Sequence, residues 1–472
     1  MNAPIWQWSA VDTARSIKDR TVSSENVVRA NVDRMRSANP AVNAVVVDLG
    51  DEATELAAAT DKKLQSGEKP RLMEGVPVTV KTNVDFAGQA NSNGVPAFEG
   101  LIATDDSPVV ANLKKAGAII IGLTNTPEFS MRAFTDNPLH GLTLNPWDHN
   151  VTCGGSSGGA ASSLALGIGA LAHGNDIGGS LRWPAHCCGL ATLKPTQGRI
   201  AAYNPSAPLE RPLMAQLFST QGPFGRSVAD VRLGLEVMAA RDPRDPWWVP
   251  APIEGPRPEA PVRVALAKVP DELDPDPAIM TIVRKAADHL ANVGYAVAEV
   301  ELPDLNEIWQ AWTDILFEEI HTLQEEAMRK VVSDDYLSVL ASYDSFSSRL
   351  DSQGFMTAIS QRTRHIRNWM TLLEDYPVIL TPACVHRTYG PREDLGGPDA
   401  VRRVFKQGLR FISSINYLGL PAAIVPVGIV DDLPVGVQLI ASRFREDIAL
   451  DAAEAIEQRA GALCPELWAR EA

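Results

Sequence analysis

The residues best suited to chemistry lie in two glycine- and serine-rich segments. The first, GGSSGGAASS, runs from Gly154 to Ser163, and the second, IGGS, runs from Ile177 to Ser180. Glycine tolerates backbone angles that other residues avoid, so several N–H groups of the second segment can turn toward one point. Such donors suit a developing oxyanion, and a serine at their edge suits a nucleophile. Taken alone, the pattern fits a tight turn between a helix and a strand equally well.

The first segment has three other interpretations. A flexible linker is disfavoured because the apolar, helix-like stretch LALGIGALAHG (164–174) follows it. A phosphate-binding loop needs a lysine directly after the glycines, and the sequence has none there. GSSGG (155–159) also matches the nucleophile elbow of α/β-hydrolases, with Ser157 at its centre. An elbow needs a strand just before it, whereas NPWDHNVTC (145–153) is typical of a loop, so an esterase that uses Ser157 is an alternative hypothesis.

A lysine in an apolar run offers a base for a serine nucleophile. Lys81 lies in GVPVTVKTNV (75–84), which is short and β-branched and predicts a buried strand. A lysine can take a proton only when it is neutral, and burial lowers its pKa from the ordinary value of about 10.4. Alone, Lys81 is better explained as a strand-end residue that snorkels to the surface. The two serine segments together favour the base.

The order of the motifs resembles that of the amidase signature hydrolases. After GGSSGGAASS come GNDIGGS (174–180), PAHCCG (184–189) and LKPT (193–196), in the order and spacing of that family. Segments similar to the family continue along nearly the whole chain, and only about 240–410 lacks them. The resemblance implies one domain over 1–472, with a mixed central sheet between helices. Its signature core would span about 70–235, and a variable, mostly helical, substrate-facing region would span about 300–410.

The resemblance also implies a reaction and a site. The enzyme would cleave a carboxamide C–N bond through an acyl-enzyme on Ser180, without a cofactor. Ser156, joined to Gly155 by a cis peptide bond, would relay a proton, and Lys81 would be the base. The oxyanion hole would consist of the backbone at Ile177, Gly178, Gly179 and Ser180. Asp176, Arg182 and Ser157 would support it.

The expected substrate is a small amide, and related sites also cleave esters and carbamates. The family builds its acyl pocket partly from the variable region and partly from the segment that contains Phe129, Met131 and Phe134. An aromatic lining there would suit aryl or long acyl groups.

Three positions differ from the usual pattern of the family: Thr82, where Asp is usual, Asn175, where Thr is usual, and Trp183, where a smaller apolar residue is common. None of the three removes a catalytic atom. They disfavour a further alternative, the glutaminase-type subunit of a tRNA-dependent amidotransferase, because that subunit tends to keep the usual residues.

The composition restricts the possible partners. The net charge of −15 and the pI near 5.1 argue against nucleic acid as the main partner. The five cysteines include no C-x-x-C pair, which is typical of a reducing compartment, and the N-terminus lacks a signal peptide. We therefore expect a cytoplasmic protein without a membrane anchor, with a homodimer as one candidate assembly.

The histidines show no metal-binding spacing, so no metal is expected. GIGALA (167–172) lacks the strand and the acidic residue of a dinucleotide site.

The elements that must position these residues alternate between helices and strands, which is typical of an α/β protein. Strands are expected in 41–47, 75–84, 118–123, 262–269, 295–302, 376–384 and 433–441, and helices in 52–64, 107–116, 277–294 and 448–460. The proline-rich stretch 242–261 interrupts the pattern, which resumes after it, so we interpret it as a surface excursion. The region 305–374 is expected to be mostly helical.

Overall fold

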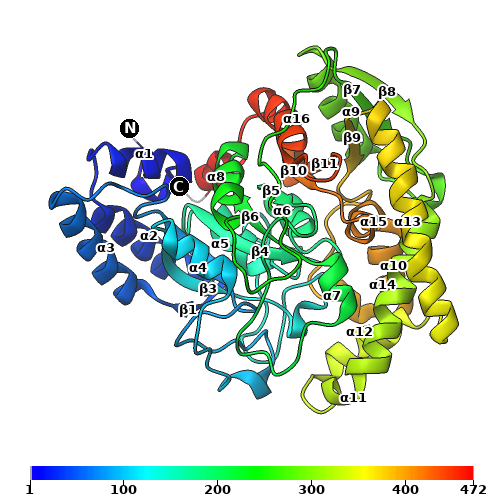
Figure 1. The fold of residues 1–472 in the computed structure, drawn as a ribbon, viewed down its shortest axis with the longest axis horizontal. Coiled ribbons are helices and arrows are strands. Elements are labelled where there is room, and N and C mark those ends of the chain that lie inside the picture. Colours follow the sequence, from blue (N-terminus) through cyan, green and yellow to red (C-terminus); the bar gives the residue numbers. More distant parts are fainter. Residues whose placement is uncertain (1–2, 471–472) are drawn as a thin grey trace.

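A computed structural model of the chain describes residues 3–470. One mixed sheet of 11 strands lies at its centre, in the order β1-β3-β2-β4-β6-β5-β10-β11-β9-β7-β8 (Figure 1). The strands are β1 (Val45–Asp48), β2 (Pro77–Lys81), β3 (Ile119–Thr124), β4 (Leu171–Asp176), β5 (Ala191–Lys194), β6 (Thr220–Gly225), β7 (Arg263–Ala267), β8 (Ala296–Val300), β9 (Val378–Pro382), β10 (Ala422–Val430) and β11 (Leu433–Ile440). This single domain, with helices around a mixed sheet, confirms the predicted fold class.

The helices surround the sheet on both faces and at its ends. They are α1 (Ala10–Lys18), α2 (Ser24–Ala38), α3 (Gly50–Gln65), α4 (Pro108–Lys115), α5 (Gly158–Ala165), α6 (Arg182–Cys188), α7 (Leu213–Phe218), α8 (Val228–Met238), α9 (Pro277–Ala291), α10 (Leu305–Glu319), α11 (Glu325–Met328), α12 (Asp334–Tyr343), α13 (Ser352–Asp375), α14 (Pro398–Arg402), α15 (Arg410–Leu418), α16 (Glu446–Ala460) and α17 (Cys464–Arg470). Two π-helical turns, Ile320–Gln324 and Arg403–Gly408, join α10 to α11 and α14 to α15. The predicted closing helix is α16, and α17 follows it.

Alternate residues of the central strands face two separate hydrophobic cores. In β3, Ile119 and Ile121 belong to one core, whereas Ile120 between them belongs to the other. Helices α2, α5, α6, α10 and α15 contribute to the first core, and α4, α8, α9 and α16 contribute to the second. A strand covered on both faces reads as a continuous apolar run, which explains the sequence around Lys81.

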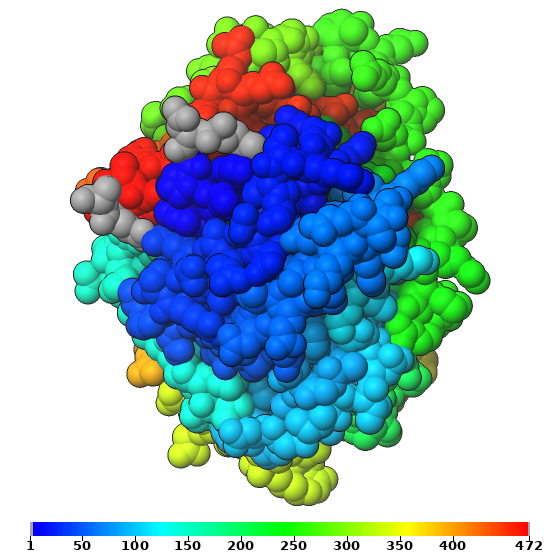
Figure 2. All heavy atoms as spheres, turned by 90° about the vertical axis from the view of Figure 1, so that its left-hand side faces the viewer, coloured from blue at the N-terminus to red at the C-terminus, as the bar shows by residue number. Residues whose placement is uncertain are grey.

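The proline-rich stretch is an excursion within one sheet, as predicted. β7 and β8 follow it in the chain and join the sheet through a parallel pairing of β7 with β9. Described residues near the two ends pack together: the ring centroids of Trp6 and Trp468 are 5.2 Å apart, and Figure 2 shows blue N-terminal residues next to red C-terminal ones.

One prediction of secondary structure was wrong and concerns the functional segment. The stretch 164–174 was expected to be helix-like, but α5 ends at Ala165 and β4 starts at Leu171. Gly167 and Gly169 between them adopt positive φ angles of 83° and 76°, which an α-helix cannot contain. A Cβ atom at Gly167 would also lie 2.3 Å from the Trp6 ring. The glycines therefore form a turn that reverses the chain from α5 into a central strand.

Candidate active site

The ends of two neighbouring parallel strands bring the candidate residues together. β2 pairs in parallel with β4, and these strands end at Lys81 and Asp176, respectively. The first serine segment packs between them, because α5 starts at Gly158, directly after Ser157. The backbone N–H of Ser157 donates to the carbonyl oxygen of Ser180 over 3.3 Å, so the two serine segments are in direct contact.

Lys81 is fully buried and surrounded by oxygen atoms. Its Nζ atom lies 2.7 Å from Ser156 Oγ, 3.1 Å from Ser157 Oγ and 2.9 Å from Asn175 Oδ1. Burial holds the pKa of Lys81 well below its usual value, and the charge of Asp176 opposes this shift only in part. An amine with these neighbours is suited to accepting a proton from a serine hydroxyl.

Ser156 follows a cis peptide bond from Gly155, as predicted. The position of Gly155 leaves no room for a side chain, because a Cβ atom would lie 2.5 Å from the backbone nitrogen of Phe134. This close contact presses the first serine segment against residues 132–134 and sets the position of Ser156 beside Lys81.

The loop that carries Ser180 is held by a buried ion pair. Arg182 Nη2 and Asp176 Oδ1 are 2.9 Å apart, and both side chains are fully buried. Arg182 also donates to Gln438 Oε1, to Asn416 Oδ1 and to the carbonyl oxygen of Ile412. Burial opposes ionisation of Asp176, but the Arg182 guanidinium outweighs it and lowers the pKa of Asp176 to about 2. The ion pair of Asp176 and Arg182 therefore holds the loop that carries Ser180 in place.

The backbone N–H groups of the loop divide into two sets. Gly179 N–H donates to Asp176 Oδ1 over 2.8 Å, so it is already used within the protein. This corrects the prediction that all four N–H groups point to one oxyanion. Within residues 3–470, no protein group accepts a hydrogen bond from the backbone N–H of Ile177, Gly178 or Ser180. Gly179 also has φ +124°, and a Cβ atom there would lie 2.4 Å from Ile412 Cγ2.

A cavity of about 250 Å³ reaches both Ser156 and Ser180. Phe129 and Met131 lie on its wall, and α10 and the π-helical turn after it add Leu316 and Ile320. Phe134 lies instead in the hydrophobic core and is fully buried, so its predicted pocket position is wrong. The backbone of Phe134 packs against Gly155, which points its side chain away from the cavity.

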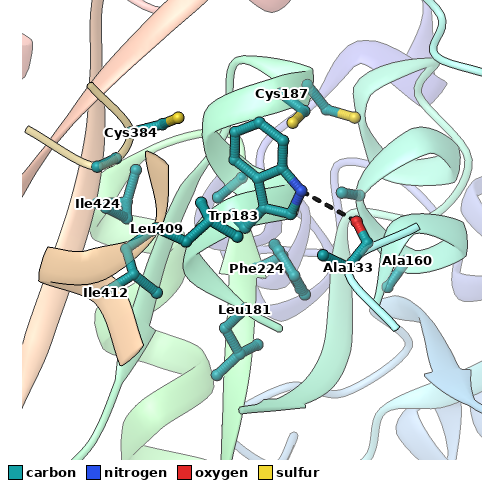
Figure 3. Packing of buried hydrophobic residues seen from close by; sticks show 14 of the residues in the cluster. Ala133, Ala160, Leu181, Trp183, Cys187, Phe224, Cys384, Leu409, Ile412 and Ile424 are labelled. Atoms are coloured by element: carbon teal, nitrogen blue, oxygen red, sulfur yellow. Dashed lines mark hydrogen bonds between the residues drawn. The ribbon is translucent and has the colours of Figure 1, made fainter. Parts of the chain in front are cut away.

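A smaller hollow of about 30 Å³ lies behind the loop of Ser180. Its wall is mainly aromatic and includes Trp183, Trp312, Phe317, Tyr343 and Phe405. Trp183 donates Nε1–H to the carbonyl oxygen of Ala133 over 3.0 Å, and Figure 3 shows its ring within the core beside Leu409. The large residue at position 183 thus fills space behind the loop and leaves the main cavity open.

Ser157 does not lie where a nucleophile elbow would place it. It is fully buried, and the wall of the main cavity contains Ser156 and Ser180 in its place. A loop precedes it, and its hydroxyl contacts Lys81 Nζ and the carbonyl oxygen of Asn175. The geometry therefore disfavours an esterase that uses Ser157.

Two asparagines were not recognised from the sequence as functional candidates. Asn175 and Asn83 exchange amide hydrogen bonds of 2.8 and 3.1 Å, and Asn83 Nδ2 also donates to Ser130 Oγ over 2.9 Å. Side chains two positions apart on a strand point to the same face. A strand that continued past Lys81 would therefore have placed Asn83 on the same side as Lys81. Asn175 had been identified only as a departure from the family pattern.

The described residues form neither a metal-binding cluster nor a helix that could span a membrane. Within residues 3–470 there is no cluster of three His, Cys, Asp or Glu side chains that could hold a metal ion. In the same range, no helix is both long and apolar enough to cross a bilayer. All five cysteines are buried and free, and Cys188 lies in the core.

Known proteins resemble this chain over nearly its whole length. The sequence model of the family described as Amidase matches residues 26–450. An indoleacetamide hydrolase of Bradyrhizobium diazoefficiens is 59% identical over 465 residues, which cover 98% of this chain and 89% of that protein. A glutamyl-tRNA(Gln) amidotransferase component of Moorella thermoacetica is 30% identical, with 94% of this chain and 96% of that protein covered. The solved structure of a bacterial aryl acylamidase, an amidase signature enzyme, shares the fold with a TM-score of 0.83 and 24% identity, with 99% of each chain covered.

Proposed function

This chain belongs to the amidase signature family and is a hydrolase that acts on amides, and we propose that Ser180, Ser156 and Lys81 perform the reaction on a primary arylacetamide. The observation that carries the proposal is the cavity that reaches Ser180 and Ser156, with the buried Lys81 amine 2.7 Å from Ser156 Oγ.

The hydrogen-bond partners of Lys81 support one direction of proton transfer. A neutral amine has two N–H donors and one lone pair. Asn175 Oδ1 can only accept, so it takes one N–H. Ser157 Oγ takes the second, because its own proton points to the carbonyl oxygen of Asn175. The lone pair then faces Ser156 Oγ, which donates its proton to Lys81.

With its proton committed to Lys81, Ser156 Oγ can accept the proton of Ser180. Ser180 Oγ then attacks the amide carbonyl carbon, and the oxyanion is stabilised by the backbone N–H groups of Ile177, Gly178 and Ser180. Ser156 returns a proton to the leaving nitrogen, the C–N bond breaks, and ammonia departs. Water, deprotonated along the same path, hydrolyses the acyl-enzyme to a carboxylate.

The size and lining of the cavity support an aryl group on the acyl side. A single water needs roughly 10–15 Å³ of such space, so about 250 Å³ is far more than a small aliphatic amide requires. Phe129, Met131, Ile177 and Leu316 offer apolar surface beside Ser180. The relative with 59% identity is an indoleacetamide hydrolase, which favours a flat aromatic ring on a methylene carboxamide. Esters and carbamates of the same acyl group are proposed side substrates.

A role as the glutaminase-type component of an amidotransferase is the less favoured alternative. The amidotransferase component of Moorella thermoacetica shares 30% identity with this chain, about half the value for the indoleacetamide hydrolase. The two functions differ in one observable. An amidotransferase component would need partner chains and glutamine, whereas the proposed enzyme acts alone on the arylacetamide.

The test is a panel of amides with the purified chain alone. Ammonia release from indole-3-acetamide, phenylacetamide, hexanamide, acetamide and glutamine gives kcat/KM for each. We expect the two arylacetamides to exceed acetamide and glutamine by at least about 100-fold, because burying an aromatic ring contributes about 3 kcal/mol or more. A preference for glutamine, or equal rates with acetamide, would contradict the proposal.

The compartment and the assembly belong to the same proposal. The five free, buried cysteines favour a reducing, cytoplasmic location. A homodimer stays a prediction, which sedimentation velocity would test.

A further inference from the structure

One guanidinium on the cavity wall has no partner within the protein. Arg211 lines the same cavity as Ser180 and Ser156. Within residues 3–470, its guanidinium takes part in neither an ion pair nor a hydrogen bond. Arg211 is half-buried, whereas three fully buried arginines each contact a carboxylate: Arg132 with Asp394, Arg182 with Asp176 and Arg199 with Glu446, at 2.7–2.9 Å. Among the described residues, buried Arg226 has no carboxylate but donates to backbone carbonyl oxygens, whereas the Arg211 guanidinium contacts neither kind of acceptor.

The surroundings of Arg211 leave its charge poorly compensated. Burial lowers its pKa, and the charges of Asp245 and Glu210 offset this only in part. Asp245 is itself engaged, since it accepts from the backbone N–H of Ala202 and of Trp247. Glu319, the acidic side chain on the described cavity wall, accepts from the backbone N–H of Met214 and is not paired with Arg211. A guanidinium in such a place is suited to bind a carboxylate through two parallel hydrogen bonds.

The loop that carries Arg211 is attached at one end to the hydrogen-bond network around Lys81. Asn204, seven positions before Arg211, donates Nδ2–H to the carbonyl oxygen of Asn83 over 3.0 Å and accepts from Asp85 N–H. Asn83 in turn pairs with Asn175, which contacts Lys81. The Asn204 end of the loop therefore lies near the residues that would supply a proton to the leaving nitrogen, and its other end is attached to α10, where Met214 N–H donates to Glu319.

We propose that the cavity also takes N-arylacetyl amino acids, with the carboxylate of the leaving amino acid bound by Arg211. The inference rests on the proposed function, because the same Ser180 attack is used. The Ser180 Oγ–carbon bond forms, the carbon–nitrogen bond breaks, and Ser156 gives its proton to the amine. A free amino acid leaves in place of ammonia, and water then releases the arylacetate.

The experiment compares two leaving groups of nearly equal size. N-(indole-3-acetyl)glycine carries the carboxylate, and N-(indole-3-acetyl)glycinamide replaces it with a neutral amide. In the unaltered enzyme we expect kcat/KM for the carboxylate to exceed that for the glycinamide by about 10- to 100-fold, the range for a hydrogen bond to a charged group. Indole-3-acetamide, which has no group to reach Arg211, serves as the internal reference.

Variants then assign the preference to one residue. Arg211→Met removes the charge, keeps an apolar stem, and should abolish the preference, mainly through KM, while indole-3-acetamide turnover changes less than about threefold. Arg211→Lys should retain part of the preference. Glu210→Gln, a charge change at the exposed neighbouring position, is the matched control and should leave the preference intact.

The outcomes separate this inference from the proposed function. An enzyme that turns over indole-3-acetamide but discriminates against the glycine conjugate would overturn the inference alone. Equal losses in Arg211→Met for all three substrates would also overturn it, because they would mean a structural role. Absence of turnover for every arylacetyl compound would refute the proposed function itself.

Discussion

The contact between Asn175 and Lys81 allows a sharp test of the proposed base. Asn175→Asp changes an amide into a carboxylate of almost the same shape, 2.9 Å from Lys81 Nζ. Two unit charges at this distance attract by about 6 kcal/mol with an effective dielectric constant near 20. Desolvation of the new carboxylate cancels part of this attraction, and nearby opposite charges shift pKa values by about 1–3 units in practice.

The direction of the shift in the pH profile follows from the protonation state in which Lys81 is active. Lys81 acts when neutral, and burial already holds its pKa well below the usual value. A new carboxylate favours the ammonium, so the pKa of Lys81 rises and the neutral fraction at a given pH falls. We expect the rising limb of kcat/KM to move up by about 1–3 pH units, with a loss of about 10- to 1000-fold at neutral pH and recovery in alkali.

The groups that already face Lys81 are few. Asp176 and His173 lie on β4, and burial lowers the pKa of His173 to about 4, so His173 is neutral over the assay range. β3 and α5, which pack beside β2, carry no charged residue, and the charged side chains of α2 are at least partly exposed. The background field on Lys81 is therefore the same in the variant and the parent, apart from the new carboxylate.

The assay measures ammonia release from indole-3-acetamide between pH 5 and 10. Asn93→Asp is the matched control, because it adds the same charge to the same cavity but contacts Ser130 and not Lys81. The rising limb of the pH profile of Asn93→Asp should move by less than about one pH unit. If the rising limb of an active Asn175→Asp enzyme coincides with that of the parent, or Asn93→Asp shifts equally, Lys81 is not the base.

Three further predictions address the base, the loop and metals. Lys81→Met should lose several orders of magnitude in kcat/KM yet melt no lower than the parent at neutral pH, because the unfolded state protonates the amine more readily than the folded state; calorimetry and initial rates check this. A lower melting temperature would mean that Lys81 is a structural residue. Asp176→Asn leaves Arg182 buried without its anion and should cost about 3–5 kcal/mol in urea unfolding, and a loss below 1 kcal/mol would disprove the bracing role. Prolonged treatment with a chelator should leave activity unchanged, whereas a loss restored by zinc would reveal a metal site.

The hydrophobic pattern and the order of the motifs predicted those parts of the site whose structure depends on residues close together in the sequence. The β-branched run around Lys81 became β2, and the motif order correctly indicated that Lys81 and Ser156 would meet. The path of the chain into β4 was missed, because a strand buried on both faces shows no alternation and its short apolar run resembles a helix. The glycine turn before Leu171 was the available signal.

The remaining errors depend on contacts between distant segments. Phe134 was assigned to the pocket by its aromatic type, but the close packing of its backbone on Gly155 directs the ring into the core. Gly179 was grouped with its neighbours, although the carboxylate of Asp176 already takes its N–H. Arg211 lies in an irregular loop held by Asn204, and no periodic pattern marks such a position.

The most direct test of the central claim is to identify the residue that becomes covalently modified. The enzyme is treated with a fluorophosphonate, digested, and mapped by mass spectrometry, with Ser180→Ala and Ser157→Ala treated in parallel. We expect a single adduct on Ser180 that persists in Ser157→Ala and disappears in Ser180→Ala. An adduct on Ser157, or labelling that survives in Ser180→Ala, would contradict it.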